Sequence, residues 1–390
     1  MKLFLIKIGK AWNVLRRDGA WRGGRRVYGA FLALFRRVRP GDILFITNGV
    51  GDSARYRTTH IAEELEQNGF TTALTVQDNP FLLSYVDKFS VFVFHRVLFT
   101  EKVKQFIELI KTQKKEIIFE ADDLVYDPQF LQYMAGYDDM NTFERKLYEN
   151  GLGGEIINDP YVKACTTTTT FLAERLNERG KQVFVVRNKV SKDDVAYAEK
   201  TLQEARRDSG FVRLCYLSGT ASHNKDFATI TDALLVLFEK YPELRLVLAG
   251  PLHTGDKLTP FRDRIEKVPF LSREKYFTLV AQMDINLAPL EIGNPFCESK
   301  SELKWFEAGL LSVPTVAAGT KTFKEAIIDG VDGYVATTSE EWIVKLSRLI
   351  EDSGFRKQMG ERAREKVLER YTTHTGKSEE YYNYLRSKIV

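Results

Sequence analysis

Short runs of β-branched, aromatic and leucine residues alternate with longer amphipathic stretches, and this alternation occurs twice along the 390-residue chain. Near-continuous apolar runs are typical of parallel strands buried on both faces, with a helix formed by each amphipathic stretch between them. The runs lie at 42–47, 71–76, 90–97 and 116–122 in the first half, and at 212–219, 244–250, 285–290 and 314–319 in the second. This pattern predicts an α/β protein with doubly wound parallel sheets.

A polar stretch at 189–209, predicted to be helical, separates the two halves. It is too long for an internal loop of one barrel, so it indicates two Rossmann-like domains that face each other across a central cleft. The predicted organisation is a basic helical segment at 1–40, a first domain at 41–190, a connector at 191–210, a second domain at 211–365 and a last helical segment at 366–390. Ligands of such sheets bind beyond the carboxyl ends of the strands, in the loops that follow them.

The first 40 residues hold a net charge of +10, whereas the rest of the chain is at −6. On a helix over 25–39, apolar side chains fall on one face and arginines on the opposite one. The apolar face comprises Val27, Phe31, Leu34, Phe35 and Val38, and the basic face comprises Arg25, Arg26, Arg36 and Arg37. This arrangement favours a helix lying in the interface of an anionic membrane. The alternatives are a helix packed on its own domain with a solvated basic face, and nucleic-acid binding, for which no motif is present.

The apolar runs of this segment are shorter than the ~20 residues that span a bilayer, and no small-residue cleavage site follows them. We therefore expect neither an export signal nor a transmembrane anchor. The expected location is the cytoplasm, peripherally on the inner face of the membrane. Cys165, Cys215 and Cys297 form no C-x-x-C pair, and the five histidines have no H-x-x-x-H spacing. That suits a reducing compartment, and we expect no metal and no cofactor.

Three loops of the first half carry candidate binding residues. Gly51 and Arg57 lie in NGVGDSARYR (48–57), where the glycines indicate either a tight turn or a loop that approaches a ligand. His95 and Arg96 follow the strand at 90–97, and Asp122 and Asp123 follow the strand at 116–122. His95 could hydrogen-bond a ligand in the cleft, stabilise developing positive charge as a dipole, or be a satisfied, half-buried histidine. For the aspartates, we expect one to orient a hydroxyl of a ligand and the other to cap the next segment.

In the second half, the loop SGTASHNKD (218–226) joins a strand to a helix. Gly219 gives room for a ligand, Thr220 offers a hydroxyl, and Lys225 sits where the helix begins. A lysine there opposes the helix dipole, and a phosphate shared between the lysine and the helix N-terminus would remove that penalty. The alternative is a solvated surface lysine. Gly250 ends the next strand and opens a further loop of the cleft.

The segment 294–316 is the most informative. Its helix, expected over 300–311, places Lys300, Lys304 and Glu307 on one stripe. The lysines could stabilise a diphosphate, and Glu307 could accept both hydroxyls of a ribose. A surface pair between Lys304 and Glu307, worth only ~0.2–0.5 kcal/mol, is the alternative.

The element order, the SGT…HNKD loop, KSELKWFEAGLLSVPTVA (300–317) and GVDGYV (330–335) resemble the retaining glycosyltransferases of family 4, which have the GT-B fold. The resemblance covers residues 42–390. Within that group the chain is similar to enzymes of bacterial O-antigen and capsule assembly, which also show YR after the first glycine loop and a DD pair after a middle strand. The last helix resembles the one that crosses back onto the first domain in this fold.

The resemblance implies a nucleotide-sugar donor held by the second domain and an acceptor held by the first. Lys225 falls on the family's diphosphate lysine and Glu307 on its ribose-binding glutamate. The chain departs from the family at Thr220, where an arginine is frequent, and at Ser299, where the first glutamate of a pair is usual; Glu298 lies one residue away. Asp122 and Asp123 are adjacent, unlike the DxD metal site of the other glycosyltransferase fold.

These observations predict a metal-independent, retaining glycosyltransferase that acts on a lipid-linked saccharide in cell-surface polysaccharide synthesis. Catalytic roles are expected for Lys225, Lys304, Asp122, Asp123 and His95. Donor binding is expected for Gly219, Thr220, Lys225, Gly250, Lys300, Lys304 and Glu307, and acceptor binding for Gly51, Arg57 and Arg96. The alternatives are a GT-B sugar-nucleotide epimerase and a non-catalytic scaffold tethered to the membrane.

Overall fold

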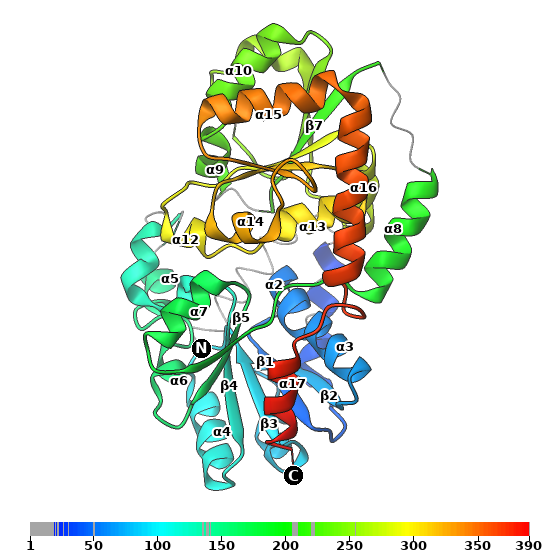
Figure 1. Cartoon of the computed structure of the whole chain (residues 1–390). Coiled ribbons are helices and arrows are strands. Elements are labelled where there is room, and N and C mark those ends of the chain that lie inside the picture. Colours follow the sequence, from blue (N-terminus) through cyan, green and yellow to red (C-terminus); the bar gives the residue numbers. More distant parts are fainter. Residues whose placement is uncertain are drawn as a thin grey trace.

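The computed structural model describes residues 19–389, apart from positions 20, 22, 26, 30, 50, 135, 138, 139, 141, 205–209, 220–222 and 254. Two six-stranded sheets form two domains, one above the other (Figure 1). The strand order is β2-β1-β3-β4-β5-β6 in the N-terminal sheet and β12-β11-β10-β7-β8-β9 in the C-terminal sheet. Every strand pair in both sheets is parallel. The predicted fold class of two doubly wound, parallel-sheet domains is thereby confirmed.

The first four strands of the N-terminal sheet coincide with the apolar runs that the sequence indicates, and two shorter strands follow them. The six strands are β1 (Ile43–Thr47), β2 (Thr72–Val76), β3 (Val91–His95), β4 (Glu116–Ala121), β5 (Ala164–Thr167) and β6 (Gln182–Val185). Every residue of β1 and β3 is buried, as expected of central strands covered on both faces. Helices α4 (Glu101–Thr112) and α7 (Thr170–Asn177) begin at Thr100 and Thr169, whose hydroxyls accept from backbone N–H groups of the first turn.

A continuous helical region follows β1. It comprises α2 (Asp52–Ala54), the π-helical turn η1 (Arg55–Thr59) and α3 (His60–Gln67). The remaining elements of this domain are η2 (Leu82–Lys88), η3 (Leu124–Tyr126), η4 (Pro128–Tyr133), α5 (Thr142–Leu147) and α6 (Gly154–Asn158).

The C-terminal sheet contains β7 (Val212–Leu217), β8 (Leu244–Ala249), β9 (Ile265–Val268), β10 (Ile285–Ala288), β11 (Thr315–Ala318) and β12 (Tyr334–Ala336). Its helices are α9 (Asn224–Ala228), α10 (Thr231–Lys240), η6 (Thr259–Arg264), α11 (Arg273–Ala281), α12 (Pro295–Glu298), α13 (Leu303–Leu310), α14 (Lys321–Ala326), α15 (Ser339–Glu351) and α16 (Ser353–Arg370). The sequence did not indicate β9, an edge strand whose two central residues are charged and exposed.

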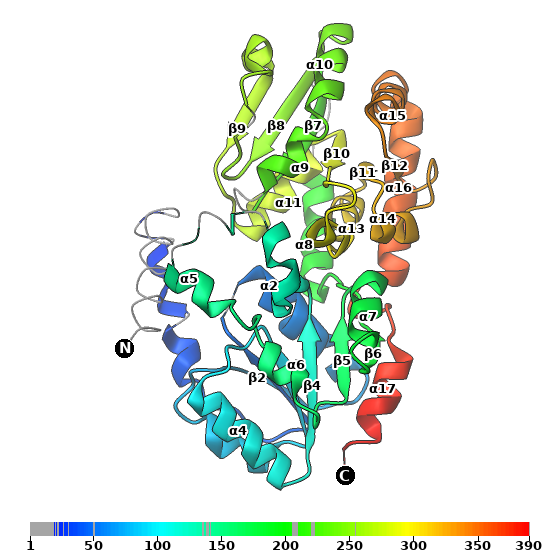
Figure 2. The same ribbon diagram turned by 90° about the vertical axis from the view of Figure 1, so that its left-hand side faces the viewer.

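Two chain segments join the domains. The predicted connector helix is α8 (Lys192–Glu204), and the chain returns after α16 to α17 (Glu379–Arg386), which packs on the N-terminal sheet (Figure 2). Tyr381, Tyr382 and Leu385 are buried in the same apolar cluster as Phe45 and Phe184. The last helix therefore packs on the N-terminal domain, although it follows α16 of the C-terminal domain.

The described residues between 19 and 35 are helical. This segment is anchored at its end, where Asn79 Nδ2 donates to the Arg36 carbonyl at 2.8 Å and Val38 is buried. Among the described residues, the structure contains no helix that is both long and apolar enough to span a bilayer. Residues 1–18 of the predicted basic segment lie outside the described residues.

Candidate functional site

A cavity of about 770 Å³ lies between the two sheets, at the carboxyl ends of their strands. The N-terminal domain lines it with residues that follow β1, β3 and β4, and the C-terminal domain with residues that follow β7, β8, β9 and β10. Predicted site residues in its wall are Arg57, Arg96, Asp122, Asp123, Gly219, Gly250, Lys300, Lys304 and Glu307. The structure thus brings together residues that are more than 200 positions apart in the sequence.

A polar cluster forms the N-terminal wall. Ser53 Oγ donates to Asp122 Oδ2 at 2.6 Å and lies 3.0 Å from His95 Nε2, and Arg96 Nε donates to Asp122 Oδ1 at 2.6 Å. Burial raises the pKa of Asp122, but Arg96 and His95 outweigh that effect and hold it well below the usual value. Asp122 is therefore a charged hydrogen-bond acceptor at the cavity wall. His95 itself is buried and contacts Thr47 Oγ1 through Nδ1, so it reaches the cavity through Ser53.

Arg96 has a backbone φ of +49°, in the left-handed region that side chains other than glycine seldom adopt. Such strain is of order 1–3 kcal/mol and is typical of functional positions. Its guanidinium also pairs with Asp123, whose other oxygen accepts from Val125 N at 3.0 Å and caps η3. Capping by one aspartate of the pair was expected, and the structure assigns it to Asp123.

Arg57 differs from its expected role. Although it borders the cavity, its side chain is 1% exposed, and it pairs with Glu120 through Nε at 2.6 Å and Nη2 at 3.0 Å. Its Nη1 donates to the carbonyl of Val186 and to Asn188. These four bonds lie inside the N-terminal domain and leave Arg57 as a structural ion pair rather than an acceptor contact. Gly51 is also placed differently: it is the N-cap of α2 and is absent from the cavity wall.

Glu307 is the centre of the C-terminal wall. It is buried, and its Oε1 accepts from the Tyr56 hydroxyl and from Arg273 Nη1, while its Oε2 accepts from the Tyr276 hydroxyl at 2.8 Å. Arg273 also binds both oxygens of Asp194 on the connector helix, at 2.7 and 2.8 Å. Burial and Glu307 raise the pKa values of Tyr56 and Tyr276 well above the usual range, so both phenols remain donors.

Sequence reasoning missed Arg273 and Tyr276, and it noted Tyr56 only as part of the YR motif. The signal available was weak: an arginine at the first position of a helix, directly after Ser272. Nothing in the local sequence pairs it with Asp194 or Glu307, which are 79 and 34 residues away.

Lys304 lies in the first turn of α13, and its Nζ donates to the carbonyl of Leu217 and sits 4.9 Å above the Tyr216 ring. Burial lowers the pKa of Lys304. Lys300 precedes α13, which begins at Leu303 rather than at the expected residue 300, yet Lys300 lines the same cavity. Gly250 has a φ of +95°, and a Cβ there would lie 1.9 Å from the Ser218 carbonyl, so only glycine fits.

The expected diphosphate lysine is not at the wall. Lys225 is exposed in α9 and does not line the cavity, whereas its neighbour His223 does. His223 Nδ1 lies 2.8 Å from Asp226 Oδ2, and burial lowers the pKa of His223. In this structure Lys225 is therefore an exposed lysine outside the cavity wall, and the diphosphate role that the resemblance implies stays a prediction. Gly219 lines the cavity, while Thr220 lies outside the described residues.

Ser299, which stands where the family has its first acid, and the neighbouring Glu298 both bond within the C-terminal domain. Ser299 is buried and donates to the carbonyl of Phe296 at 2.8 Å. Glu298 accepts from the backbone N–H groups of Gly293 and Lys321, both at 3.1 Å. Neither residue lines the cavity, so the first acid of the family pattern has no counterpart there among the described residues.

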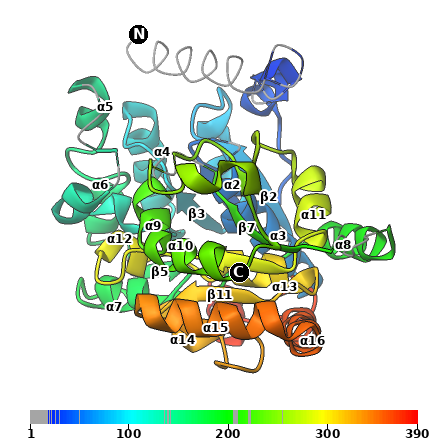
Figure 3. The same ribbon diagram turned by 90° about the horizontal axis from the view of Figure 1, so that it is seen from above.

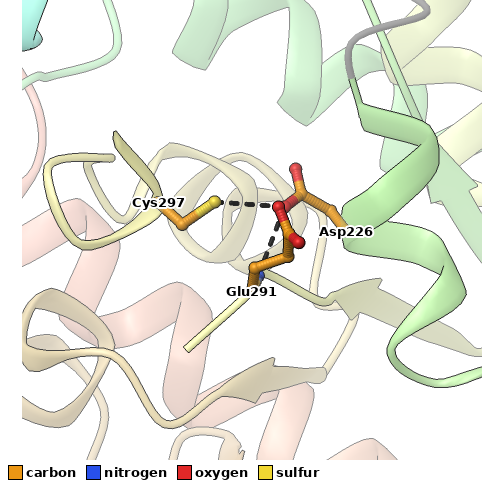
Figure 4. A group of neighbouring side chains, drawn as sticks. All are labelled: Asp226, Glu291 and Cys297. Atoms are coloured by element: carbon orange, nitrogen blue, oxygen red, sulfur yellow. Dashed lines mark hydrogen bonds between the residues drawn. The ribbon is translucent and has the colours of Figure 1, made fainter. Parts of the chain in front are cut away.

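Asp226, Glu291 and Cys297 form a compact group with the number of ligands that a metal needs (Figure 4). Their hydrogen bonds argue for a different role. Asp226 Oδ1 accepts from Cys297 Sγ at 3.2 Å and from the Glu291 backbone N–H at 3.3 Å. Burial raises the pKa of the Cys297 thiol to about 12, so in the absence of an ion the thiol stays protonated and donates to Asp226. These hydrogen bonds tie α9 to α12.

Part of the chain is similar to a known protein family. The family model described as "Glycosyl transferase-like" matches residues 232–375, less than half of the chain. A search of curated proteins finds no match to this sequence.

Solved structures share the fold over most of the chain. HepE from Anabaena in complex with UDP is 16% identical, with a TM-score of 0.57 over 89% of this chain and 100% of its own. A glycosyltransferase from Rickettsia africae is 13% identical, with a TM-score of 0.61 over 90% of this chain and 99% of its own. Sucrose-phosphate synthase from Thermosynechococcus elongatus is 13% identical, with a TM-score of 0.60 over 89% and 99%. These likenesses establish the GT-B fold.

Proposed function

We propose that this protein is a retaining glycosyltransferase that moves a sugar from a nucleotide-sugar donor onto a saccharide carried by a lipid. One observation carries the proposal. A single cavity holds two lysines and glycine-rich backbone on one wall, and on the other wall an ionised aspartate bonded to a serine hydroxyl. The first wall suits a diphosphate and the second suits a sugar hydroxyl.

The donor is assigned to the C-terminal wall. Lys300 and Lys304 would neutralise the charge that grows on the leaving diphosphate, helped by the backbone around Gly219 and Gly250. Glu307 would accept the ribose hydroxyls in place of the phenols of Tyr56 and Tyr276, which occupy its oxygens here. HepE is described in complex with UDP and with UDP-glucose, which supports a nucleotide-sugar donor for this chain.

The acceptor is assigned to the N-terminal wall. Asp122, held by Arg96 and Ser53, is placed to orient an acceptor hydroxyl, and its low pKa keeps it charged for that purpose. Catalysis then rests on leaving-group stabilisation and on positioning rather than on a metal. A cytoplasmic role in O-antigen or capsule assembly follows the resemblance of the sequence motifs.

Donor turnover measured with and without a glycan acceptor separates this proposal from its alternatives. Transfer that needs the acceptor and keeps the anomeric configuration of the donor sugar supports it. Epimerisation of the sugar nucleotide without any acceptor would identify a GT-B epimerase, and nucleotide binding without turnover would identify a scaffold. A thermal-shift screen of UDP-, GDP- and dTDP-sugars selects the donor, because a ligand at 100 times its Kd adds about 2.7 kcal/mol of stability.

A further inference from the structure

The described N-terminal helix exposes an unusual set of large apolar side chains. Trp21 is 87% exposed, Tyr28 62% and Phe31 55%, and Leu32 and Phe35 are each about half exposed. At ~100° per residue these five positions fall within a stripe of ~120° on one side of the helix. Phe31 and Phe35 also contact each other, with ring centroids 5.2 Å apart.

The way the helix is anchored explains why this stripe faces outward. Asn79 and Tyr85 both donate to the Arg36 carbonyl, and Arg37 stacks over the Phe81 ring at 4.6 Å. Val38 is buried, while Val27 and Leu34 are half-buried. Within the helix, the apolar side chains of Val27 and Leu34 are the half-buried ones, so their side faces the domain and the aromatic stripe is left uncovered. A helix that packed on its own domain through its whole apolar face would cover the aromatic side chains as well.

The charges around the stripe fit an anionic surface. Arg25 and Arg36 border it, Arg39 follows the helix, and all three are exposed. Arginines flanking aromatic side chains are the composition of a helix that lies in the headgroup region of a bilayer, with its rings at the acyl boundary.

The same helix reaches the candidate active site. Gly29, one residue after Tyr28, lines the cavity together with Asp52, Arg55 and Arg96 of the N-terminal wall. Figures 2 and 3 place the described part of this helix on the opposite side of the molecule from α15 and α16. Any surface that contacts the aromatic stripe therefore lies beside the N-terminal wall of the cavity, which is the wall assigned to the acceptor and is called the acceptor end below.

We propose that the stripe Trp21, Tyr28, Phe31, Leu32 and Phe35 docks on an anionic phospholipid bilayer and holds the acceptor end of the cavity at the membrane surface. The acceptor then enters from the plane of the bilayer, so its class is a saccharide whose lipid stays in the membrane. This second statement rests on the proposed function, whereas the docking does not.

Vesicle binding tests the docking without any glycosyl transfer. The probes are vesicles of phosphatidylcholine alone and of phosphatidylcholine mixed with phosphatidylglycerol. We expect the full chain to bind the mixed vesicles, and Phe31→Ser with Phe35→Ser to weaken that partition by at least roughly tenfold. The matched control is Ile328→Ser with Val344→Ser, which removes two apolar side chains of similar exposure from the C-terminal domain and should not change binding. Arg25→Gln with Arg36→Gln should reduce the preference for the anionic lipid, because each basic residue near such a surface contributes about 1 kcal/mol.

Two further readouts locate the contact. Brominated lipids should quench the fluorescence of Trp21. Its signal is taken as the difference between the wild type and Trp21→Phe, because Trp12 lies outside the described residues, whereas Trp305 and Trp342 are buried. The three cysteines are buried, so a fluorophore can be placed selectively at Arg55→Cys, beside the cavity, or at Val344→Cys on α15. Lipids with a headgroup quencher should quench the first label and spare the second.

Equal vesicle binding by the stripe variant and the wild type would overturn the docking. So would a wild type that binds no vesicles but loses a dimer on substitution, which would assign the stripe to a second copy of the chain. Quenching of both labels, or of neither, would overturn the placement of the acceptor end. UDP binding is measured in parallel: vesicle binding without UDP binding would count against the proposed function and leave the docking intact.

Discussion

At the scale of single residues, Glu307 shows what a local sequence pattern can predict and what it cannot. Its spacing from Lys304 marks it as a candidate in the sequence, and the structure places both at the cavity. What the pattern could not give is the set of donors that already occupy the carboxylate, since Tyr56 is 251 residues away and belongs to the other domain. A ribose diol has to displace these donors, so they set the cost of donor binding.

Tyr56→Phe tests that competition. The change removes one donor from Glu307 Oε1 and keeps the ring against Phe306. We expect UDP to bind more tightly by up to about tenfold, because a hydrogen bond to a charged group contributes about 1.5 kcal/mol that the ligand no longer has to replace. Titration calorimetry measures the Kd. Glu307→Gln serves as the reference for loss of the acceptor group and should weaken UDP binding; unchanged affinity in both variants would place the ribose elsewhere.

The lowered pKa of Lys304 predicts how UDP affinity and protein stability change with pH. Burial lowers the pKa of Lys304, so it loses its charge at a lower pH than the usual ~10.4 of lysine. As pH rises through that lowered value, UDP affinity should fall, because the diphosphate loses a cation. Between the lowered pKa of Lys304 and the usual ~10.4, the unfolded chain binds more protons than the folded chain. The free energy of unfolding of the unliganded protein should therefore rise with pH over this interval.

Lys304→Gln checks both effects by difference. UDP binding and thermal unfolding are followed against pH for this variant and for the wild type. The variant should lose the alkaline fall in affinity, and its kcat should drop by roughly 10²–10³ if it resembles the loss of one preorganised electrostatic contact. Lys225→Gln is the control, since this exposed lysine lies outside the cavity wall. A larger effect at Lys225 than at Lys304 would restore the role that the sequence resemblance implied.

Chelation tests the metal-free chemistry. The acid–thiol group of Asp226, Glu291 and Cys297 is satisfied by its own hydrogen bonds. Transfer should therefore persist in EDTA, with the lysines neutralising the leaving group. Activity lost in EDTA and restored by Mg²⁺ or Mn²⁺, together with its loss in Cys297→Ser, would reassign this group as a metal site.

At the scale of elements, the apolar runs were sufficient to place the central strands, because buried parallel strands need continuous apolar sequence. They were not sufficient for β9, since an edge strand tolerates the charges of Glu266 and Lys267. The helix after β1 illustrates a second limit. Its π-helical turn at Arg55–Thr59 adds a residue to one turn and sends Tyr56 and Arg57 to different partners, which a regular period of 3.6 residues cannot anticipate.

Arg57→Ala decides between the expected acceptor role and the structural one. Removing one partner of a buried ion pair leaves Glu120 uncompensated and costs about 3–5 kcal/mol, so the N-terminal domain should melt at a clearly lower temperature. Arg55→Ala is the matched control, because its pair with Asp52 is exposed at 3.6 Å and contributes about 0–1 kcal/mol. Differential scanning calorimetry compares them. A variant at Arg57 that keeps wild-type stability but loses acceptor affinity would favour the role that the sequence indicated.

At the scale of the whole molecule, side-chain contacts at and near the cavity wall join the two domains. Arg187 pairs with Glu302 at 3.0 Å, and Asn188 donates to Ser301 at 2.9 Å. The Tyr56 hydroxyl also donates to Glu307 across the cavity wall. The repeated strand and helix pattern was enough to predict two domains, because each sheet is a local property of its half. The cross-domain pairs depend on how the two halves are placed relative to each other. The hydrophobic periodicity within one half cannot predict that placement.

Deleting residues 377–390 tests how the last helix couples the domains. The deletion removes Tyr381, Tyr382 and Leu385 from the core of the N-terminal domain, and it removes the Tyr382 bond to Glu64. Loss of one such buried aromatic side chain costs about 3–5 kcal/mol, which is comparable to the whole stability of a domain. The cavity wall of the C-terminal domain is left intact, because α17 contributes nothing to it.

We therefore expect calorimetry of the truncated chain to show two separate transitions. The lower one belongs to the N-terminal domain and should not move with UDP, whereas the upper one should rise as UDP is added, by about 2.7 kcal/mol at 100 times the Kd. The full chain should show both domains stabilised together, since α16 and α17 tie them into one unit. Leu385→Ala is a milder variant, costing about 2–5 kcal/mol, that separates the transitions partly if the truncated chain aggregates. A single transition at the wild-type midpoint in both variants would mean that α17 is dispensable, and that the contacts around Tyr56 and Arg187 alone hold the two domains together.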